Sequence, residues 1–85
     1  MAVYCRRNRG DENRLGYTVS TKLGHAVTRN RVRRRLREIY RLNSHSLKTG
    51  MDIVVVARTR CVDAKYSELE QAFLSACREL KLIRE

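Results

Sequence analysis

The chain has 85 residues and a hydrophobic fraction of 42%, which fit one folded domain with a thin core and exclude a wholly disordered chain. No apolar run approaches the roughly 18 residues of a membrane-spanning helix. The net charge of +10 comes from fifteen Arg and four Lys against nine acids, and this arginine-rich balance indicates an anionic partner, nucleic acid before a membrane surface.

The first twenty residues are predicted to form two strands joined by a turn. Residues 2–7 carry Val, Tyr and Cys, and residues 14–20 alternate so that Leu15 and Tyr17 face the same side. Residues 8–13 contain Gly, Asp and Asn, which are typical of a turn. We expect the two strands to pair as an antiparallel hairpin.

A connector at residues 21–27 leads into a helix predicted from about residue 26 to about residue 44. The apolar residues of this helix follow the helical period and form one narrow stripe: Val32, Leu36, Ile39 and Tyr40. Most of the remaining helix surface therefore displays arginine.

The second half of the chain is predicted to contain a strand, a loop and a closing helix. Residues 52–58 are β-branched and nearly continuous, which is typical of a strand covered on both faces. Residues 59–63 are expected to form the loop, and the helix follows at about residues 65–82. Its core-facing positions are Tyr66, Leu69, Phe73, Ala76, Leu80 and Ile83. The order of elements predicts an α+β fold with both helices on one face of a sheet, whose other face is partly open.

Most of the positive charge lies between Lys22 and Arg41. This segment holds eight basic residues and one acid, Glu38, so it carries +7 of the total +10. A helix stabilised only by surface salt bridges would place acids among the arginines, and a membrane-surface helix would have a broader apolar face. We therefore expect binding to nucleic acid, and RNA rather than DNA, because Asn30 is the only base-reading side chain among the arginines.

Catalytic and metal-binding constellations are missing from the sequence. His25 and His45 have no nucleophile or carboxylate at a recognisable spacing, and the three cysteines show no CxxC pattern. We expect free thiols in a reducing cytoplasm and no protein-bound cofactor. Asp52 and Asp63 are assigned to turns and helix caps. A nuclease that works without a partner is therefore disfavoured.

The segment VSTKLGHAVTRNRVRRRLRE, residues 19–38, resembles the RNR signature of the bacterial ribonuclease P protein family. The strand at residues 52–58 and the closing helix also resemble elements of that family, so the likeness covers nearly the whole chain. The residues that match the signature are Ser20, Lys22, Gly24, Ala26, Val27, Arg29, Asn30, Arg31, Arg34, Arg37 and Glu38.

The resemblance implies a two-layer α+β sandwich with a mixed sheet of about four strands and a left-handed βαβ crossover. It implies a protein subunit that binds ribonuclease P RNA and the 5′ leader of precursor tRNA, while Mg²⁺ held by the RNA subunit supports the hydrolysis. DNA and membranes are not expected as partners. A ribosomal or other structured-RNA-binding protein without a role in cleavage is the alternative.

Carried over to this sequence, the resemblance assigns two sets of candidate residues. Tyr4, Tyr17 and Arg58 are candidates for leader binding, although Tyr17 equally fits a place in the core. The candidates for binding the RNA subunit are Lys22, Arg29, Asn30, Arg31, Arg33, Arg34, Arg37 and Arg41.

Family members usually begin with a basic tail and a helix, whereas this sequence starts at the expected first strand. We therefore expect residues 1–85 to form a single RNA-binding domain without the family's N-terminal helix. The leader cleft would then lack one wall, and the apolar edge left exposed would favour self-association.

Overall fold

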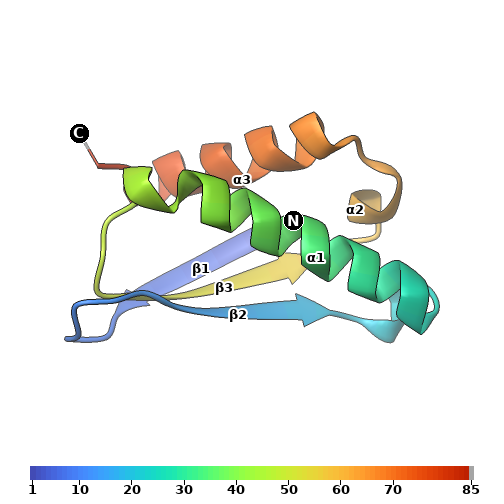
Figure 1. Ribbon diagram of the computed structural model, residues 1–85, viewed down its shortest axis with the longest axis horizontal. Helices are drawn as coiled ribbons and strands as arrows, with labels where there is room; N and C mark the ends of the chain where they lie inside the picture. Colours follow the sequence, from blue (N-terminus) through green and yellow to red (C-terminus); the bar gives the residue numbers. More distant parts are fainter. Residues whose placement is uncertain (85) are drawn as a thin grey trace.

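The computed structural model of the chain describes residues 1–84. Two helices, α1 and α3, lie on one face of a three-stranded sheet, and no other element within residues 1–84 covers the opposite face (Figure 1). The strands are β1 (Ala2–Arg7), β2 (Arg14–Val19) and β3 (Met51–Ala57). The helices are α1 (Ala26–Asn43), α2 (Arg60–Asp63) and α3 (Tyr66–Glu79), with 3₁₀ turns η1 (Thr21–Leu23) and η2 (Ser44–Ser46).

The sheet has the order β1-β3-β2, so the predicted hairpin between the first two strands is wrong. β3 lies between them, antiparallel to β1 and parallel to β2. β3 is the most continuous apolar strand, and in the central position it pairs with two strands. The turn after β1 is held next to the start of β3 by a hydrogen bond from the Asn8 N–H to the Gly50 carbonyl at 3.0 Å. Residues 1–84 form three strands, where about four were expected.

The connection from β2 to β3 is a left-handed crossover. In Figure 1 the chain runs along β2 in the foreground, returns over the sheet through α1 and enters β3 behind β2. This is the handedness that the resemblance implied, and it is opposite to that of nearly all βαβ units.

The two faces of β3 differ in burial. Ile53, Val55 and Ala57 are buried beneath the helices, whereas Val54 on the opposite face is 40% exposed. The expectation that this strand is covered on both faces is therefore wrong. β-Branched residues on the uncovered face reflect the steric preference of the pleated strand rather than burial.

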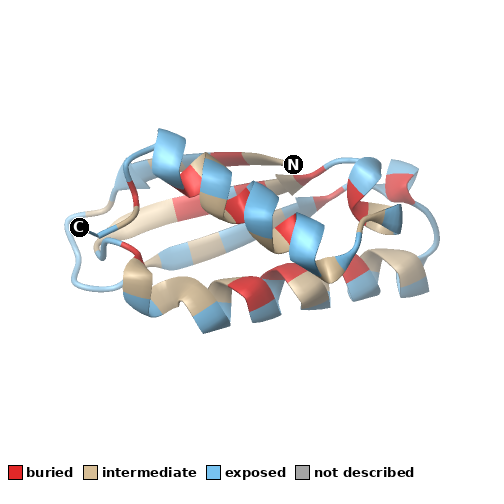
Figure 2. Ribbon diagram, turned by 90° about the horizontal axis from the view of Figure 1, so that it is seen from above, coloured by how far each residue is buried: buried red, intermediate tan, exposed pale blue. Residues whose placement is uncertain are grey.

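The helices bury the stripes that the period predicted, except at the end of α3. Val32, Leu36 and Ile39 of α1 are buried, and Figure 2 shows buried and exposed residues alternating along both long helices. In α3 the buried residues are Leu69, Phe73 and Cys77. Leu80 was expected in the core but is 38% exposed, since the helix ends at Glu79 and Lys81 adopts a left-handed conformation (φ 58°) that turns Leu82 inward instead.

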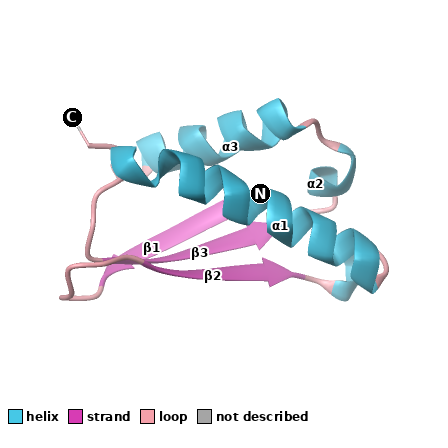
Figure 3. Cartoon of the chain, viewed as in Figure 1, coloured by secondary structure: helices cyan, strands magenta, loops and turns pink. Residues whose placement is uncertain are grey.

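The segment predicted as a loop after β3 contains the single helical turn α2 (Figure 3). Its residue Cys61 is buried, so the turn closes the end of the core beside α1. All three cysteines are free thiols, as expected. Burial raises the pKa of the Cys77 thiol to about 11, which fits a packing role rather than a reactive one.

Candidate nucleic-acid interface

The exposed side of α1 and the turn before it form a cationic surface, which we call the arginine face: Lys22, Asn30, Arg31, Arg34, Arg37 and Arg41. Arg41 pairs with Glu38 at 2.7 Å, and this is the only ion pair on α1 within residues 1–84. No carboxylate of the described chain lies within ion-pairing distance of Arg31, Arg34 or Arg37. Three neighbouring guanidinium groups are thus available to an external anion.

Three further arginines of α1 are held partly against the protein. Arg33 donates a hydrogen bond to Asn30 Oδ1 at 3.1 Å, and Arg35 donates to the Ala64 carbonyl at 3.0 Å. Arg29 is half-buried, and its buried Nε has no partner in the described chain. Of the predicted RNA contacts, Arg29 and Arg33 are therefore less accessible than the others.

The entry into α1 adds backbone donors to the arginine face. Gly24 has φ 134°, in the region that favours glycine, and allows the chain to turn from η1 into the helix. His25 at the N-cap makes no capping hydrogen bond, and the first turn contains no acid. The free N–H groups and the positive end of the helix dipole thus face solvent, next to Val27, which is 81% exposed.

The uncovered side of the sheet is a second surface, which we call the open face. Tyr4 of β1 and Gly16 of β2 both lie opposite Val54 of β3 and form one row across the sheet. Tyr4 is 57% exposed, and the row lies in a hollow of about 500 Å³. Glycine leaves the backbone of β2 bare at this point. A flat ring beside an apolar floor can stack with an unpaired base.

The structure separates the three leader-binding candidates. Tyr17 lies on the helix-covered side of β2, where burial raises its pKa and the nearby Arg37 opposes that shift. Tyr4 and Tyr17 therefore face opposite sides of the sheet. Arg58 is exposed and directly follows the last residue of β3. Arg14 pairs with Asp52 near the start of β3, so Arg58 and Arg14 lie at opposite ends of the sheet. Only Tyr4 belongs to the hollow.

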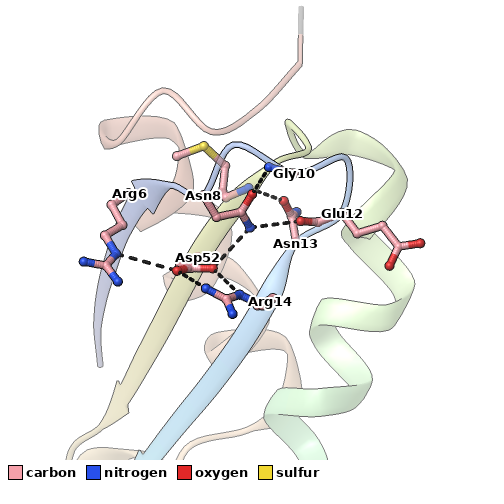
Figure 4. A network of polar contacts seen from close by, with 8 residues as sticks. Arg6, Asn8, Gly10, Glu12, Asn13, Arg14 and Asp52 are labelled. Atoms are coloured by element: carbon pink, nitrogen blue, oxygen red, sulfur yellow. Dashed lines mark hydrogen bonds and ion pairs between the residues drawn. The ribbon is translucent and has the colours of Figure 1, made fainter.

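One end of the open face is built around Asp52 (Figure 4). Arg14 donates from Nε and Nη2 to the two carboxylate oxygens at 2.8 and 2.9 Å. Asn8 donates to the same carboxylate at 3.1 Å, and the Arg6 Nε lies 3.6 Å from it. The carboxylate therefore links all three strands, while Nη1 of Arg14 makes no hydrogen bond within residues 1–84.

Asn8 and Asn13 fix the turn beside this carboxylate. Asn8 Oδ1 accepts from the Gly10 N–H at 2.7 Å, and Asn8 Nδ2 also donates to the Glu12 carbonyl at 3.0 Å. Asn13 donates to the Lys48 carbonyl and accepts from the Met51 N–H at 2.9 Å. Asp52 is thus not the turn or cap residue that we expected, because it lies within β3 and its ion-pair partners come from β1 and β2.

The described residues contain neither a metal-binding cluster nor a membrane span. Within residues 1–84, no three His, Cys, Asp or Glu side chains gather closely enough to hold a metal ion. None of the described helices is both long and apolar enough to cross a membrane.

Comparison with known proteins identifies one family. The family model "Ribonuclease P" matches residues 1–81. The ribonuclease P protein component of Alkaliphilus oremlandii is 47% identical over 83 residues, which cover 98% of this chain and 73% of that protein. The corresponding protein of Alkaliphilus metalliredigens is 45% identical over 83 residues, covering 98% of this chain and 75% of that protein.

Solved structures of the same family have the same fold. The RNase P protein of Staphylococcus aureus matches with a TM-score of 0.85 at 31% identity, covering 96% of this chain and 75% of that one. The RNase P protein of Thermotoga maritima matches with a TM-score of 0.79 at 34% identity, covering 86% and 70%.

The Asp52 network makes stability depend on acid pH. Hydrogen bonds from Arg14 and then Asn8 lower the pKa of Asp52 from 3.8 to about 2. The folded chain therefore binds fewer protons than the unfolded chain between these values, and the stability present above pH 4 is lost as the pH falls towards 2. Urea unfolding from pH 2 to 6 should show that Asp52→Asn is less stable than the original chain at pH 6, with the difference narrowing at low pH. Asp63→Asn is the control, because Asp63 has no ion pair within residues 1–84. If the difference in unfolding free energy between Asp52→Asn and the original chain stayed constant with pH, the lowered pKa of Asp52 would be contradicted.

Proposed function

Because the chain belongs to the ribonuclease P protein family, we propose that it binds the RNA subunit of ribonuclease P and the 5′ leader of precursor tRNA. It is a protein subunit of ribonuclease P and thus an accessory part of an endonuclease. In this proposal the RNA subunit carries out the cleavage, with RNA-held Mg²⁺ supplying the charge stabilisation. The protein contributes binding and orientation.

Binding of the RNA subunit is proposed for the arginine face. The observation that supports it is the absence of acidic partners for Arg31, Arg34 and Arg37 within the described chain. Arginine binds phosphate through two parallel hydrogen bonds. Because the three arginines are spaced regularly along the helix, they can contact successive phosphates of one RNA strand. Release of counterions from the RNA then drives the association.

Binding of the leader is proposed for the open face. Tyr4 stacks with a base over the floor of Gly16 and Val54. Arg14, held in place by Asp52, directs its free Nη1 donors at a neighbouring phosphate. This arrangement suits a single strand of any sequence, because stacking and phosphate contacts do not read base edges.

Together the two surfaces explain how a chain without its own chemistry assists cleavage. The RNA subunit and the precursor tRNA repel each other because both carry dense negative charge. A cationic protein between them reduces this repulsion and lowers the Mg²⁺ concentration that the reaction needs. The alternative of a ribosomal or other structured-RNA binder is supported by the charge alone, and nothing else in the structure favours it.

Reconstitution tests the proposed function directly. Added to ribonuclease P RNA and a precursor tRNA at low Mg²⁺, the chain should increase the rate of 5′-leader removal. The chain without RNA is the control and should not cleave. Normal binding to ribosomal RNA with no gain in cleavage would instead favour the alternative.

Substitutions on the arginine face should weaken binding to the RNA subunit. Arg34→Ala and Arg37→Ala each remove one phosphate contact, so each should lower the salt dependence of log K by about 1. Arg60→Ala removes the same charge from α2 and serves as the control. Filter binding or fluorescence titration from 50 to 300 mM salt measures the slope, and an unchanged slope in both variants would show that these arginines do not meet phosphate.

Substitution of Tyr4 should affect only substrates that carry a leader. Tyr4→Ala removes one stacked base, which is worth about 1–3 kcal/mol, so the affinity of the reconstituted complex for precursor tRNA should fall about tenfold. Tyr4→Phe keeps the ring and should retain the affinity, and mature tRNA should bind equally to all three proteins. An equal loss with mature tRNA would place Tyr4 outside the leader site.

A further inference from the structure

A second cationic surface lies at the end of the molecule where α3 stops and the chain leaves α1. We call it the terminal patch, and its four basic residues are all exposed: Lys48, Arg78, Lys81 and Arg84. Three of them, Lys48, Arg78 and Lys81, line a hollow of about 710 Å³ together with Ile83. None belongs to the arginine face or the open face.

The backbone under the terminal patch is held by contacts between segments far apart in the sequence. The Lys48 N–H donates to the Leu82 carbonyl and the Arg84 N–H donates to the Ser46 carbonyl, both at 2.7 Å. Leu47 and Ile83 form a β-bridge between these hydrogen bonds. These contacts hold the backbone of Lys48 next to that of Leu82 and Ile83, and Lys48, Arg78 and Lys81 line the same hollow.

Burial on the inner side points the cations outward. Leu47 and Leu82 are 0% and 1% exposed and fix the two segments to the core. The left-handed conformation of Lys81 places Leu82 inside and leaves the lysine in solvent. The backbone that carries the cations is therefore fixed by the fold.

The charge of the terminal patch is not neutralised within the described residues. None of its four basic residues forms an ion pair within residues 1–84, and Glu79 is the only acid between residues 78 and 84. The negative end of the α3 dipole favours cations here, but it uses none of their side-chain donors. The three cations around the hollow are therefore available to an external anion.

We propose that the terminal patch is a third binding surface for RNA phosphates, which contacts a different stretch of RNA from the first turns of α1. The first turns of α1 lie at the opposite end of the molecule from the end of α3 (Figure 1). A polyanion fits the patch better than a membrane does, because Ile83 is the only apolar residue in the lining. This inference rests on the proposed function, and the RNA is either the RNA subunit or the precursor tRNA.

A pair of matched double variants tests the terminal patch. Lys48→Gln with Arg78→Gln removes two of its charges, and Arg60→Gln with Lys65→Gln removes two exposed charges near α2 at the other end of the molecule. Circular dichroism should show both proteins folded. The patch variant should bind its RNA about tenfold more weakly at 150 mM salt and lower the salt slope by about 2, whereas the control should change affinity by less than about threefold.

Two arms distinguish the source of the phosphates. In one arm, each protein is titrated with ribonuclease P RNA alone, and in the other, precursor tRNA is titrated into the assembled complex. A loss confined to the first arm assigns the patch to the RNA subunit, and a loss confined to the second assigns it to the substrate. Equal weakening by the patch and control variants in both arms would overturn the inference, because it would reflect net charge alone.

The same titrations separate this inference from the proposed function. An Arg34→Gln, Arg37→Gln variant is run beside the others. If it weakens binding and the patch variant does not, the terminal patch fails and the proposed function stands. If the unmodified chain binds neither RNA and raises no cleavage, the proposed function fails.

Discussion

The arginine helix remains part of the folded chain through three buried side chains, Val32, Leu36 and Ile39. Burial of each contributes about 1.5–3 kcal/mol. Repulsion between two exposed charges about 4 Å apart in water costs about 1 kcal/mol, and less with salt. The burial of these three side chains therefore outweighs the repulsion between the arginines only while the guanidinium groups stay in solvent. A narrow apolar stripe and an exposed cationic face are two consequences of the same balance.

The position of β3 at the centre of the sheet determines both where α1 lies and which face of the sheet becomes the open face. Because β2 and β3 are parallel neighbours, the connection between them must cross one face of the sheet, and α1 fills that crossover. The other face stays uncovered and carries Tyr4, Gly16 and Val54 in one row. Two residues along β3, Asp52 ties the three strands together, since its partners Arg6 and Arg14 come from the two outer strands. The fold thus creates both surfaces by one choice of topology.

The sequence predicted features that depend on local periodicity and failed on those that depend on topology. The buried stripe of α1 follows from a 3.6-residue period, and the placement of Leu15 and Tyr17 on one side follows from strand alternation. The strand order does not, because sequence neighbours such as β1 and β2 normally pair, and here β3 inserts between them. The Asp52–Arg14 contact joins residues 38 positions apart, so it became visible only with the correct register.

The end of α3 and the orientation of the candidate site residues also could not be predicted from periodicity alone. Leu80 fits the helical period of α3, but the chain leaves the helix at Glu79, and the core position passes to Leu82. Tyr4 and Tyr17 look alike as aromatic strand residues, and only the register places them on opposite faces. The left-handed crossover came from the resemblance, since physical rules of connection favour the other hand.

The arginines that have no ion pair within residues 1–84 have opposite effects on the free chain and on the proposed complex with RNA. Salt screens the repulsion between neighbouring arginines, which favours the folded free protein, yet it also weakens contacts to RNA phosphates. Internal acids on α1 would relieve the first problem but would occupy the donors that RNA needs, and Glu38 does this to Arg41 alone. RNA that binds only the folded chain repays the lost stability by mass action. In the proposed complex, the RNA would supply the neutralisation that a self-contained protein achieves with its own carboxylates.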